Sequence, residues 1–157
     1  EDGEVSMQVS DTKINFAFSN IVLTSKLIDG KFPDYTRVIP TDNDKMLTVD
    51  AKSFAQSVDR VSAISSEKSR AVKLELAPDS LALSVSNPDS GSASDELSVS
   101  YAAEAMEIGF NARYLMDITS QLDGEVATFE LADSGSPTLV RDDKDTDALY
   151  VLMPMRV

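Results

Sequence analysis

Closely spaced acidic residues are the first candidates for chemistry in this chain. Asp143, Asp145 and Asp147 alternate with other residues, as acids do at the start of a calcium-binding loop. Such a loop also needs Gly at its sixth position and Glu at its twelfth, whereas Ala148 and Pro154 stand at those positions. We therefore interpret 143–147 as the solvated tip of a hairpin and expect no bound metal.

The composition restricts the other catalytic groups. The 157 residues include neither histidine nor cysteine, which removes the commonest general base and the nucleophiles that rely on it. No glycine-rich phosphate-binding loop occurs, and we expect no cofactor. With 27 acidic residues, a catalytic pair of carboxylates stays open as an alternative, because distances in space cannot be read from the sequence.

The compartment and the partners are constrained more weakly. The absence of cysteine fits a reducing cytosol, and no apolar run approaches the roughly 18 residues of a membrane span. The acidic start without Met resembles the middle of a longer chain. A net charge of −13 argues against tight binding to nucleic acid, because phosphate contacts need Lys and Arg.

Most of the chain alternates apolar and polar residues between short turns, which predicts half-buried antiparallel strands. Near the N-terminus the alternating apolar residues are Val5, Met7 and Val9, then Ile14, Phe16 and Phe18, then Val22. Further strands are expected at 45–49, 72–77, 81–87, 95–101, 106–110, 126–132, 137–141 and 148–153.

Two segments have helical periodicity instead. Asp50 is a suitable N-cap for a helix over 51–64, and Asn111 for a helix over 112–122. We expect Gly124 to mark the end of the second helix. The apolar stripes are Phe54, Val58 and Val61 in the first helix, and Leu115, Ile118 and Leu122 in the second.

The two helical segments are similar in sequence, together with their surroundings. Residues 49–54 match 110–115 in the order apolar, cap, Ala, base, any, apolar, and the later strands 74–77 and 129–132 also match. Such similarity indicates a repeated unit whose copies share one core. The predicted fold class is therefore α+β, with two helices packed on antiparallel sheets built from a duplicated strand–helix–strand–strand unit.

A polar stretch that begins with Pro predicts a domain boundary at 40–45. We expect residues 1–40 to be the remnant of a preceding domain and residues 41–157 to form a domain of their own. The first part has strands but no helix, so it cannot close a core unaided.

Two surfaces have a possible role in binding. Lys52, Gln56 and Arg60 recur every fourth residue and share one face of the first helix, which is either a plain solvated face or the lining of a channel. The chain also ends in the apolar segment 150–157, in which Pro154 interrupts strand pairing. This segment is either a final core strand or an exposed apolar surface of the kind that binds partners.

Four stretches together resemble the bacterial DNA sliding clamps, the β subunits of DNA polymerase III. They occur in that family's order and cover essentially the whole chain: LIDGKFPDYTRVIP at 27–40, SSEKSRAVKL at 65–74, MEIGFNARYLMDI at 106–118 and YVLMPMRV at 150–157. The resemblance implies the DNA-clamp fold, with residues 1–40 at the end of clamp domain two and residues 41–157 forming domain three.

The resemblance also implies a function. Clamps form a head-to-tail homodimeric ring around duplex DNA, act without catalysis, and tether replicative and repair polymerases. These polymerases, the clamp loader and other proteins dock through short, partly hydrophobic peptides in a groove between domains two and three. A cytoplasmic, nucleoid-associated protein without membrane contact is implied. A ring holds DNA by topology, so the acidic net charge is no longer an objection, and only the inner face need be basic or neutral.

The resemblance assigns three sets of residues. The DNA-facing set is Lys52, Gln56, Arg60 and Arg113. The dimer-interface set is Ala63, Ile64, Asp89, Asp95, Glu96 and Leu97, on a helix end and an edge strand at 92–97. The peptide-binding set is Pro33, Arg37, Val38, Asn111, Tyr114, Gly135, Pro137, Val151, Leu152, Met153, Pro154, Met155 and Arg156, with Ser69 at its rim.

The chain departs from the family in length, because the first domain and most of the second are missing. We therefore expect no closed ring, weak binding to linear duplex, and peptide binding that is weakened but not lost. Two alternatives stay open: an enzyme that uses carboxylates, and a β-rich adhesion or scaffold module. Binding of a clamp-docking peptide would separate the clamp interpretation from both.

Overall fold

The computed structural model of the chain describes residues 4–65 and 70–157, so Ser69 lies outside the described residues. The chain forms two units, Glu1–Asp34 and Tyr35–Val157, which are treated separately below. The division falls after Asp34, ahead of the boundary expected at 40–45.

The first unit is an antiparallel meander. Its strands are β1 (Ser6–Val9), β2 (Lys13–Phe18) and β3 (Ile21–Lys26), paired in the order β1-β2-β3. Within its described part, residues 4–34, no residue is buried, and Met7, Val9 and Val22 are each at least 60% exposed. These three strands therefore have no core of their own, as the sequence predicts.

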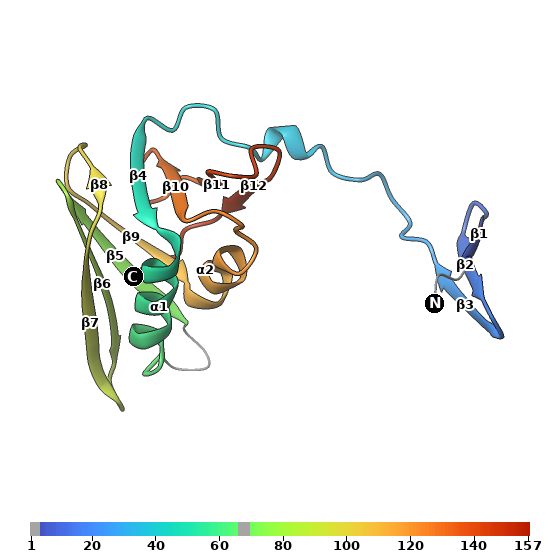
Figure 1. The fold of residues 1–157 in the computed structure, drawn as a ribbon, viewed down its shortest axis with the longest axis horizontal. Coiled ribbons are helices and arrows are strands. Elements are labelled where there is room, and N and C mark those ends of the chain that lie inside the picture. The colour runs from blue at the N-terminus through green and yellow to red at the C-terminus, as the bar shows by residue number, and fades with distance from the viewer. Residues whose placement is uncertain (1–3, 66–69) are drawn as a thin grey trace. The chain divides into compact units, whose positions relative to one another are not determined.

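In the residues that the structure describes, the second unit contains two α-helices, one short 3-10 helix and nine strands (Figure 1). In chain order its elements are η1 (Tyr35–Arg37), β4 (Lys45–Asp50), α1 (Ala51–Ser62), β5 (Ala71–Ala77), β6 (Ser80–Asn87), β7 (Gly91–Ser98), β8 (Ser100–Tyr101), β9 (Met106–Asn111), α2 (Ala112–Thr119), β10 (Val126–Leu131), β11 (Thr138–Asp142) and β12 (Leu149–Leu152).

The strands of the second unit form two antiparallel sheets that exchange their first strands. One sheet has the order β12-β11-β10-β4-β8 and the other β7-β6-β5-β9. β4 begins the first half of the unit but pairs with β10 of the second half, and β9 begins the second half but pairs with β5 of the first. Neither half can therefore complete its sheet without the other.

The two N-caps occupy equivalent places in this exchange. Asp50 lies opposite Val126 at the start of β10, and Asn111 lies opposite Ala71 at the start of β5. The first helical N–H donates across in both cases, from Ala51 to the Glu125 carbonyl at 2.9 Å and from Ala112 to the Arg70 carbonyl at 2.7 Å. The predicted repeat is confirmed down to its hydrogen bonds.

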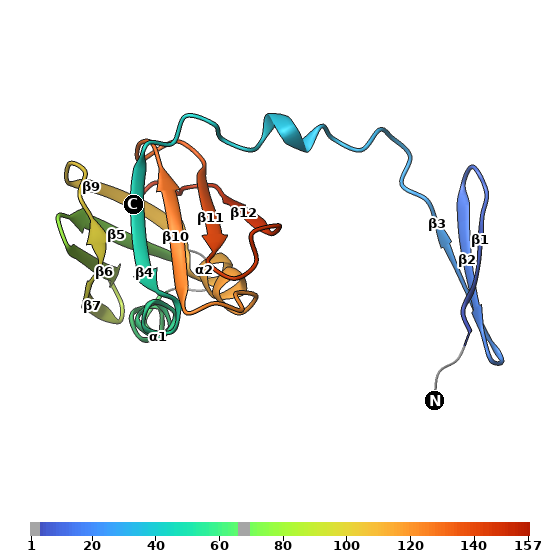
Figure 2. The same ribbon diagram turned by 45° about the horizontal axis from the view of Figure 1, so that its top comes forward.

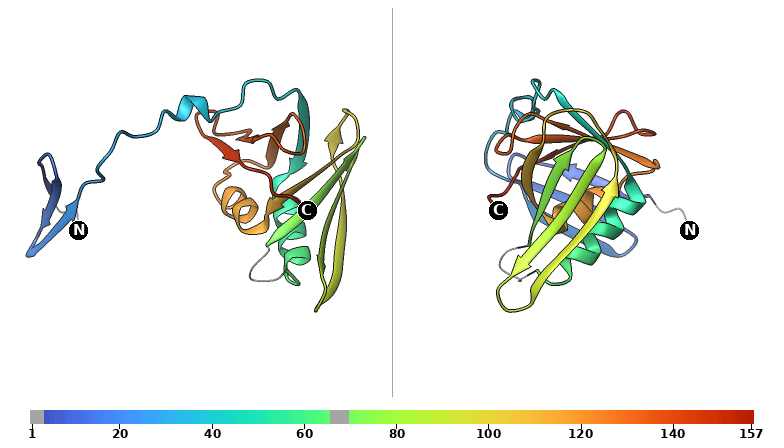
Figure 3. Two further views of the ribbon diagram at one scale, coloured as in Figure 1. Left: turned by 180° about the vertical axis from the view of Figure 1, so that it is seen from behind. Right: turned by 90° about the vertical axis from the view of Figure 1, so that its left-hand side faces the viewer.

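The helices lie side by side and fill the space that the two sheets leave open (Figures 1 and 2). Phe54, Val58, Val61 and Leu115 are fully buried, as their spacing predicts, whereas Ile118 and Leu122 pack at the edge of the core. The Phe54 ring lies 5.1 Å from the Phe129 ring at a tilt of 59°. This pair joins α1 to β10 and hence one half of the repeat to the other. The second sheet, seen nearly face-on in the right-hand view of Figure 3, has α1 running beside β7.

The helix ends and one strand differ from the prediction. α2 ends at Thr119 with Ser120 as its C-cap in the right-handed conformation, so Gly124 does not cap it. Gly124 is required for another reason, because a Cβ there would collide with the carboxylates of Asp142 and Asp143. The strand expected at 95–101 is two strands, β7 and β8, which belong to different sheets.

The calcium-like segment 143–147 is exposed and lies in the loop between β11 and β12. Within residues 4–65 and 70–157, no group of three or more acids is arranged to hold a metal ion. The same described residues include no helix that is both long and apolar enough to cross a membrane.

Candidate functional site

The C-terminal strand presents one apolar face outward. β12 pairs with β11 so that Leu152 lies opposite Thr138, and the strand ends before Pro154, as predicted. Because side chains alternate along a strand, Val151 and Met153 share the outer face and Leu152 points inward. Met153 is 58% exposed, and Leu152 is only 4% exposed in the core. Leu152 therefore contributes to the core, and it also lines the pocket described below.

Beyond Pro154 the chain crosses to the other sheet. The Met155 N–H donates to the Gly109 carbonyl of β9 at 2.8 Å, and the two residues form an isolated antiparallel bridge. A Cβ at Gly109 would lie 2.7 Å from the Met155 carbonyl oxygen and would collide with the Val157 side chain. Gly109 therefore permits the close approach that holds the C-terminal segment in place.

An apolar pocket of about 530 Å³ lies between α2 and β12. Its aliphatic walls come from both elements, and the Asp117 carboxylate and two tyrosine rings give it polar groups. This combination suits an apolar side chain carried on a peptide backbone. The lining residues are Tyr114, Asp117, Ile118, Leu149, Tyr150, Val151, Leu152 and Met153.

The pocket contains only part of the predicted peptide-binding set. Tyr114, Val151, Leu152 and Met153 line it, whereas Asp117, Ile118, Leu149 and Tyr150 were not predicted. Helical spacing offered a signal for two of them, because Asp117 and Ile118 lie one turn after Tyr114. Asn111 is one turn earlier, and its Oδ1 accepts the Arg113 N–H at 2.9 Å as the helix cap.

A second group of the predicted residues lies on neighbouring segments of the same unit. Val38, 53% exposed, follows η1, and its N–H donates to the Tyr35 carbonyl at 2.9 Å. The Asn43 side chain, further along the same segment, donates to the carbonyls of Glu130 at 2.7 Å and Pro137 at 3.0 Å. Asn43 thereby ties the segment after η1 to the β10–β11 hairpin.

The remaining predicted peptide-binding residues are placed as follows. Arg37 lies in η1, and Gly135 lies in the exposed β10–β11 loop, where its N–H donates to Asp133 Oδ1 at 2.8 Å. Pro33 belongs to the first unit. Arg156 lines a different hollow, of about 640 Å³, together with Lys73, Asn87 and Asp89.

The exposed face of α1 carries the expected polar residues, but one is already engaged. Lys52, Gln56 and Arg60 are all exposed. Arg60 Nε lies 3.1 Å from Asp95 Oδ2 on β7, and the buried Ser57 hydroxyl donates to the same oxygen at 2.8 Å. These hydrogen bonds, from Arg60 first and then Ser57, hold the pKa of Asp95 below its usual value. A residue expected to face DNA thus contacts one expected at the dimer interface.

The predicted edge strand is confirmed. Among the described residues β7 pairs only with β6, so it ends the four-stranded sheet, and Glu96 Oε1 on its outer face accepts from Ser80 Oγ at 2.8 Å. Ala63 is the C-cap of α1, and the Ile64 carbonyl accepts from Asn87 Nδ2 at 2.8 Å. Leu97 is half-buried against the core.

The exchanged strands and the paired helices identify the second unit as an α+β domain with the DNA-clamp fold, made of two similar halves. The model of the family "DNA polymerase III beta subunit, C-terminal domain" matches residues 36–156. The chain belongs to this family.

Individual relatives agree with the family match. The chain is 54% identical over 153 residues to the beta sliding clamp of Caulobacter vibrioides, covering 98% of this chain and 41% of that protein. It is 36% identical over 156 residues to the beta sliding clamp of Escherichia coli, covering 99% and 43%. A sliding clamp from Bartonella birtlesii, solved bound to griselimycin, superposes with a TM-score of 0.90 at 52% identity, covering 99% and 42%. The chain thus spans less than half the length of these relatives.

Proposed function

We propose that the chain is part of a DNA polymerase processivity factor, a sliding clamp that encircles duplex DNA and docks polymerases and repair proteins without catalysis. Family membership over residues 36–156 supports the clamp assignment. The observation that carries the docking role is the apolar pocket between α2 and β12. In this role the full-length protein acts in the cytoplasm at the nucleoid, where its subunits close into a homodimeric ring.

The pocket suits a short peptide with an apolar anchor. Val151 on the outer face of β12, Met153 directly after that strand and Ile118 on α2 surround a space in which a Leu or Phe side chain loses its contact with water. Methionine is unbranched and polarisable, so Met153 adapts to anchors of different shape. Tyr114 and Asp117 at the α2 side offer a hydroxyl and a carboxylate to the peptide backbone or its polar side chains.

The other predicted residues extend this function. Arg37, Val38, Asn111, Gly135, Pro137 and Met155 would continue the peptide path beyond the pocket. Lys52, Gln56, Arg60 and Arg113 would face DNA. The edge strand β7, with Asp89, Asp95 and Glu96, would pair with the partner subunit of the full-length ring, where an exposed edge is suited to extending a sheet across an interface.

A titration tests the docking role. A fluorescently labelled peptide with adjacent Leu and Phe anchors is titrated against the wild type, Met153→Ala and Met46→Ala. Met46 is the matched control, because it is an exposed methionine, 48% against 58% for Met153, that lies on β4 and does not line the pocket. Loss of an interface anchor typically costs about 1–3 kcal/mol, or roughly 5- to 150-fold in affinity.

The expected result is that Met153→Ala weakens binding by that factor while Met46→Ala binds as the wild type does. Circular dichroism checks that each variant is folded. Equal binding by folded Met153→Ala and wild type would show that the pocket is not the docking site. No binding by the wild type would contradict the docking role of this chain as a whole.

A further inference from the structure

A cleft between the end of α1 and the start of α2 gathers two arginines. Its volume is about 440 Å³, and its entrance is polar on both sides. α1 and the residues after it contribute an acid and two hydroxyls, and the other wall contributes the arginines. The lining residues are Asp59, Ser62, Ser65, Arg70, Ala112, Arg113 and Met116.

Arg70 is held at this cleft by its own backbone. Its carbonyl oxygen accepts the N–H of Ala112 at 2.7 Å, which fixes it directly beside Arg113. The hydrogen bond uses only main-chain atoms, so the guanidinium of Arg70 takes no part in it, and the residue is exposed. The fold therefore places two cations side by side although they are 43 positions apart in the sequence.

Both cations of the cleft are available to an anion. Elsewhere in the unit, Lys73 and Arg141 each lie close to a glutamate, and Arg60 to Asp95. In the described part of the chain, no carboxylate forms an ion pair with Arg70. Arg113 Nε reaches Asp117 Oδ2 only at 4.0 Å, with both side chains about two-thirds exposed, and such a pair contributes little.

The internal repeat supplies a comparison within the same molecule. Glu125 accepts the Ala51 N–H at the start of α1, as Arg70 accepts the Ala112 N–H at the start of α2. Lys52 corresponds in the same way to Arg113. At these corresponding positions the α1 end has one cation and one acid, whereas the α2 end has two arginines, so the α2 end is the better suited of the two to an anion.

We propose that this cleft seats one backbone phosphate of the encircled duplex, with Arg70 and Arg113 as donors. The inference rests on the proposed function and adds Arg70, which the sequence analysis did not single out. Guanidinium groups match the geometry of phosphate oxygens and remain charged at any physiological pH. Asp59 at the opposite wall repels the phosphate and so lowers its affinity, which keeps binding weak enough for the duplex to slide.

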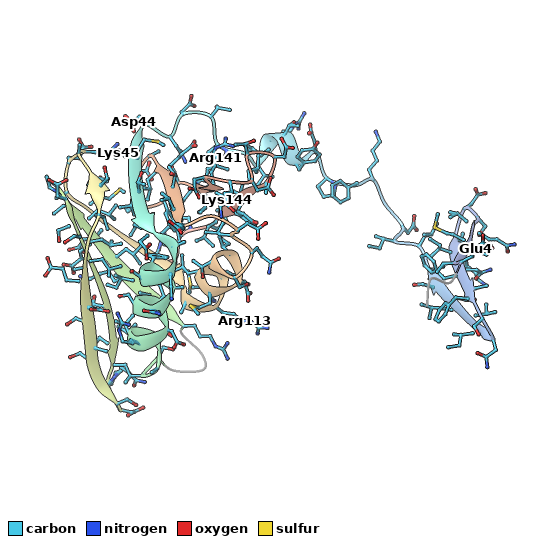
Figure 4. All side chains as sticks on the ribbon, viewed as in Figure 1. Glu4, Asp44, Lys45, Arg113, Arg141 and Lys144 are labelled. Atoms are coloured by element: carbon cyan, nitrogen blue, oxygen red, sulfur yellow. The ribbon has the colours of Figure 1, made fainter. Side chains whose placement is uncertain are left out.

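The test measures duplex binding and its salt dependence by fluorescence anisotropy with a labelled linear duplex of roughly 20 base pairs. Arg70→Ala and Arg113→Ala are compared with Lys144→Ala, which also removes one positive charge. Lys144 lies on the β11–β12 loop, well separated from Arg113 (Figure 4). Each arginine variant should bind about 3- to 10-fold more weakly at low salt, and the slope of log K against log salt should fall by about 0.9. Lys144→Ala should change neither.

A second part of the test uses a variant that is expected to bind the duplex more tightly. Glu125→Arg places an arginine at the position that corresponds to Arg70, beside Lys52, and should raise affinity about 3- to 10-fold and increase the salt slope by about 0.9. Thermal denaturation followed by circular dichroism shows that each variant is folded.

The outcomes separate this inference from the proposed function. If folded Arg70→Ala and Arg113→Ala bind like the wild type while Lys52→Ala binds more weakly, the cleft is not the phosphate site but the DNA-facing role stands. Equal losses in the arginine variants and Lys144→Ala would show that only total charge matters, which also overturns the inference. If the wild type binds no duplex even at low salt, both the inference and the DNA-facing role fail.

Discussion

A single residue, Gly109, holds the C-terminal segment against the sheet of β5, β6, β7 and β9. Its carbonyl holds the Met155 N–H, and its missing Cβ leaves room for the Met155 carbonyl and the Val157 side chain. The segment is continuous with β12, whose outer face lines the pocket. A change at Gly109 therefore reaches the pocket through the backbone.

Gly109→Ala should lower the free energy of unfolding by about 1–3 kcal/mol, because an added methyl group in a filled space forces the backbone to shift. Urea denaturation measures this change. Gly135→Ala is the control, since a Cβ there meets only Asp133 Oδ1 at 3.6 Å, and it should cost less than about 0.5 kcal/mol. Equal stability of the two variants would contradict the close approach at Gly109.

Asp142 organises the turn that leads into β10. Its Oδ2 accepts the N–H groups of Asp123 at 2.7 Å and Gly124 at 3.2 Å, and its Oδ1 accepts the Lys144 N–H at 3.0 Å. These hydrogen bonds, the one from Lys144 first, hold the pKa of Asp142 below its usual value. The carboxylate thus stabilises the fold when ionised.

The pH dependence of stability follows from this lowered pKa. The stabilisation is fully present above the unfolded pKa of about 3.9 and is lost as the pH falls through the lower folded pKa. Asp142→Asn should be less stable than the wild type at pH 7, since an amide leaves one of three N–H groups unpaired. Urea denaturation from pH 7 to pH 2 should show the difference persisting at pH 5 and shrinking below pH 4. A difference that grows in acid would contradict this role.

Among the secondary-structure elements, the helix α1 packs one half of the repeat against the other. Phe54 points from α1 onto Phe129 of the other half, and both side chains are at most 1% exposed. Phe54→Ala should therefore cost about 3–5 kcal/mol, the range for large-to-small changes of buried aromatic residues. Chemical denaturation of this variant, with Tyr114→Ala as an exposed aromatic control, measures the cost. A loss below about 1 kcal/mol would mean that α1 does not bind the halves together.

Most helices and strands were predictable because the sequence patterns that indicate them are local. Asp50 and Asn111 cap the helices through their own side chains, and the alternation in β5 and β10 follows from one buried face. The exchange of β4 and β9 was not predictable, since it depends on pairing across more than 70 residues in one case. Gly124 misled the prediction because glycine serves close approach as well as helix ends.

The candidate site was predictable only in part, for the same reason. Tyr114, Val151 and Met153 lie in the segments that carry the family resemblance. Leu152 alternates into the core and also lines the pocket, so one residue serves both packing and the site. The contact of Arg60 with Asp95 joins residues 35 positions apart, so no local pattern announces it.

At the scale of the whole molecule, the exposed edge of β7 governs self-association. Antiparallel pairing of two β7 strands would bring the Glu96 carboxylates of two copies to the same face, and like charges across a strand pair are destabilising. The 17.0 kDa chain should therefore sediment as a monomer and should not be retained on circular DNA. Analytical ultracentrifugation at micromolar concentration measures this, and a tight dimer would contradict it.

The most direct test of the docking role is to map where a clamp-docking peptide binds. Backbone and methyl NMR signals of the isotope-labelled chain are followed while an unlabelled peptide with adjacent Leu and Phe anchors is added. The pocket between α2 and β12 predicts that the largest shifts fall on Tyr114, Ile118, Val151 and Met153, with little change on β5, β6 and β7. Shifts concentrated on those three strands, or spread evenly over the chain, would contradict a docking site in this pocket.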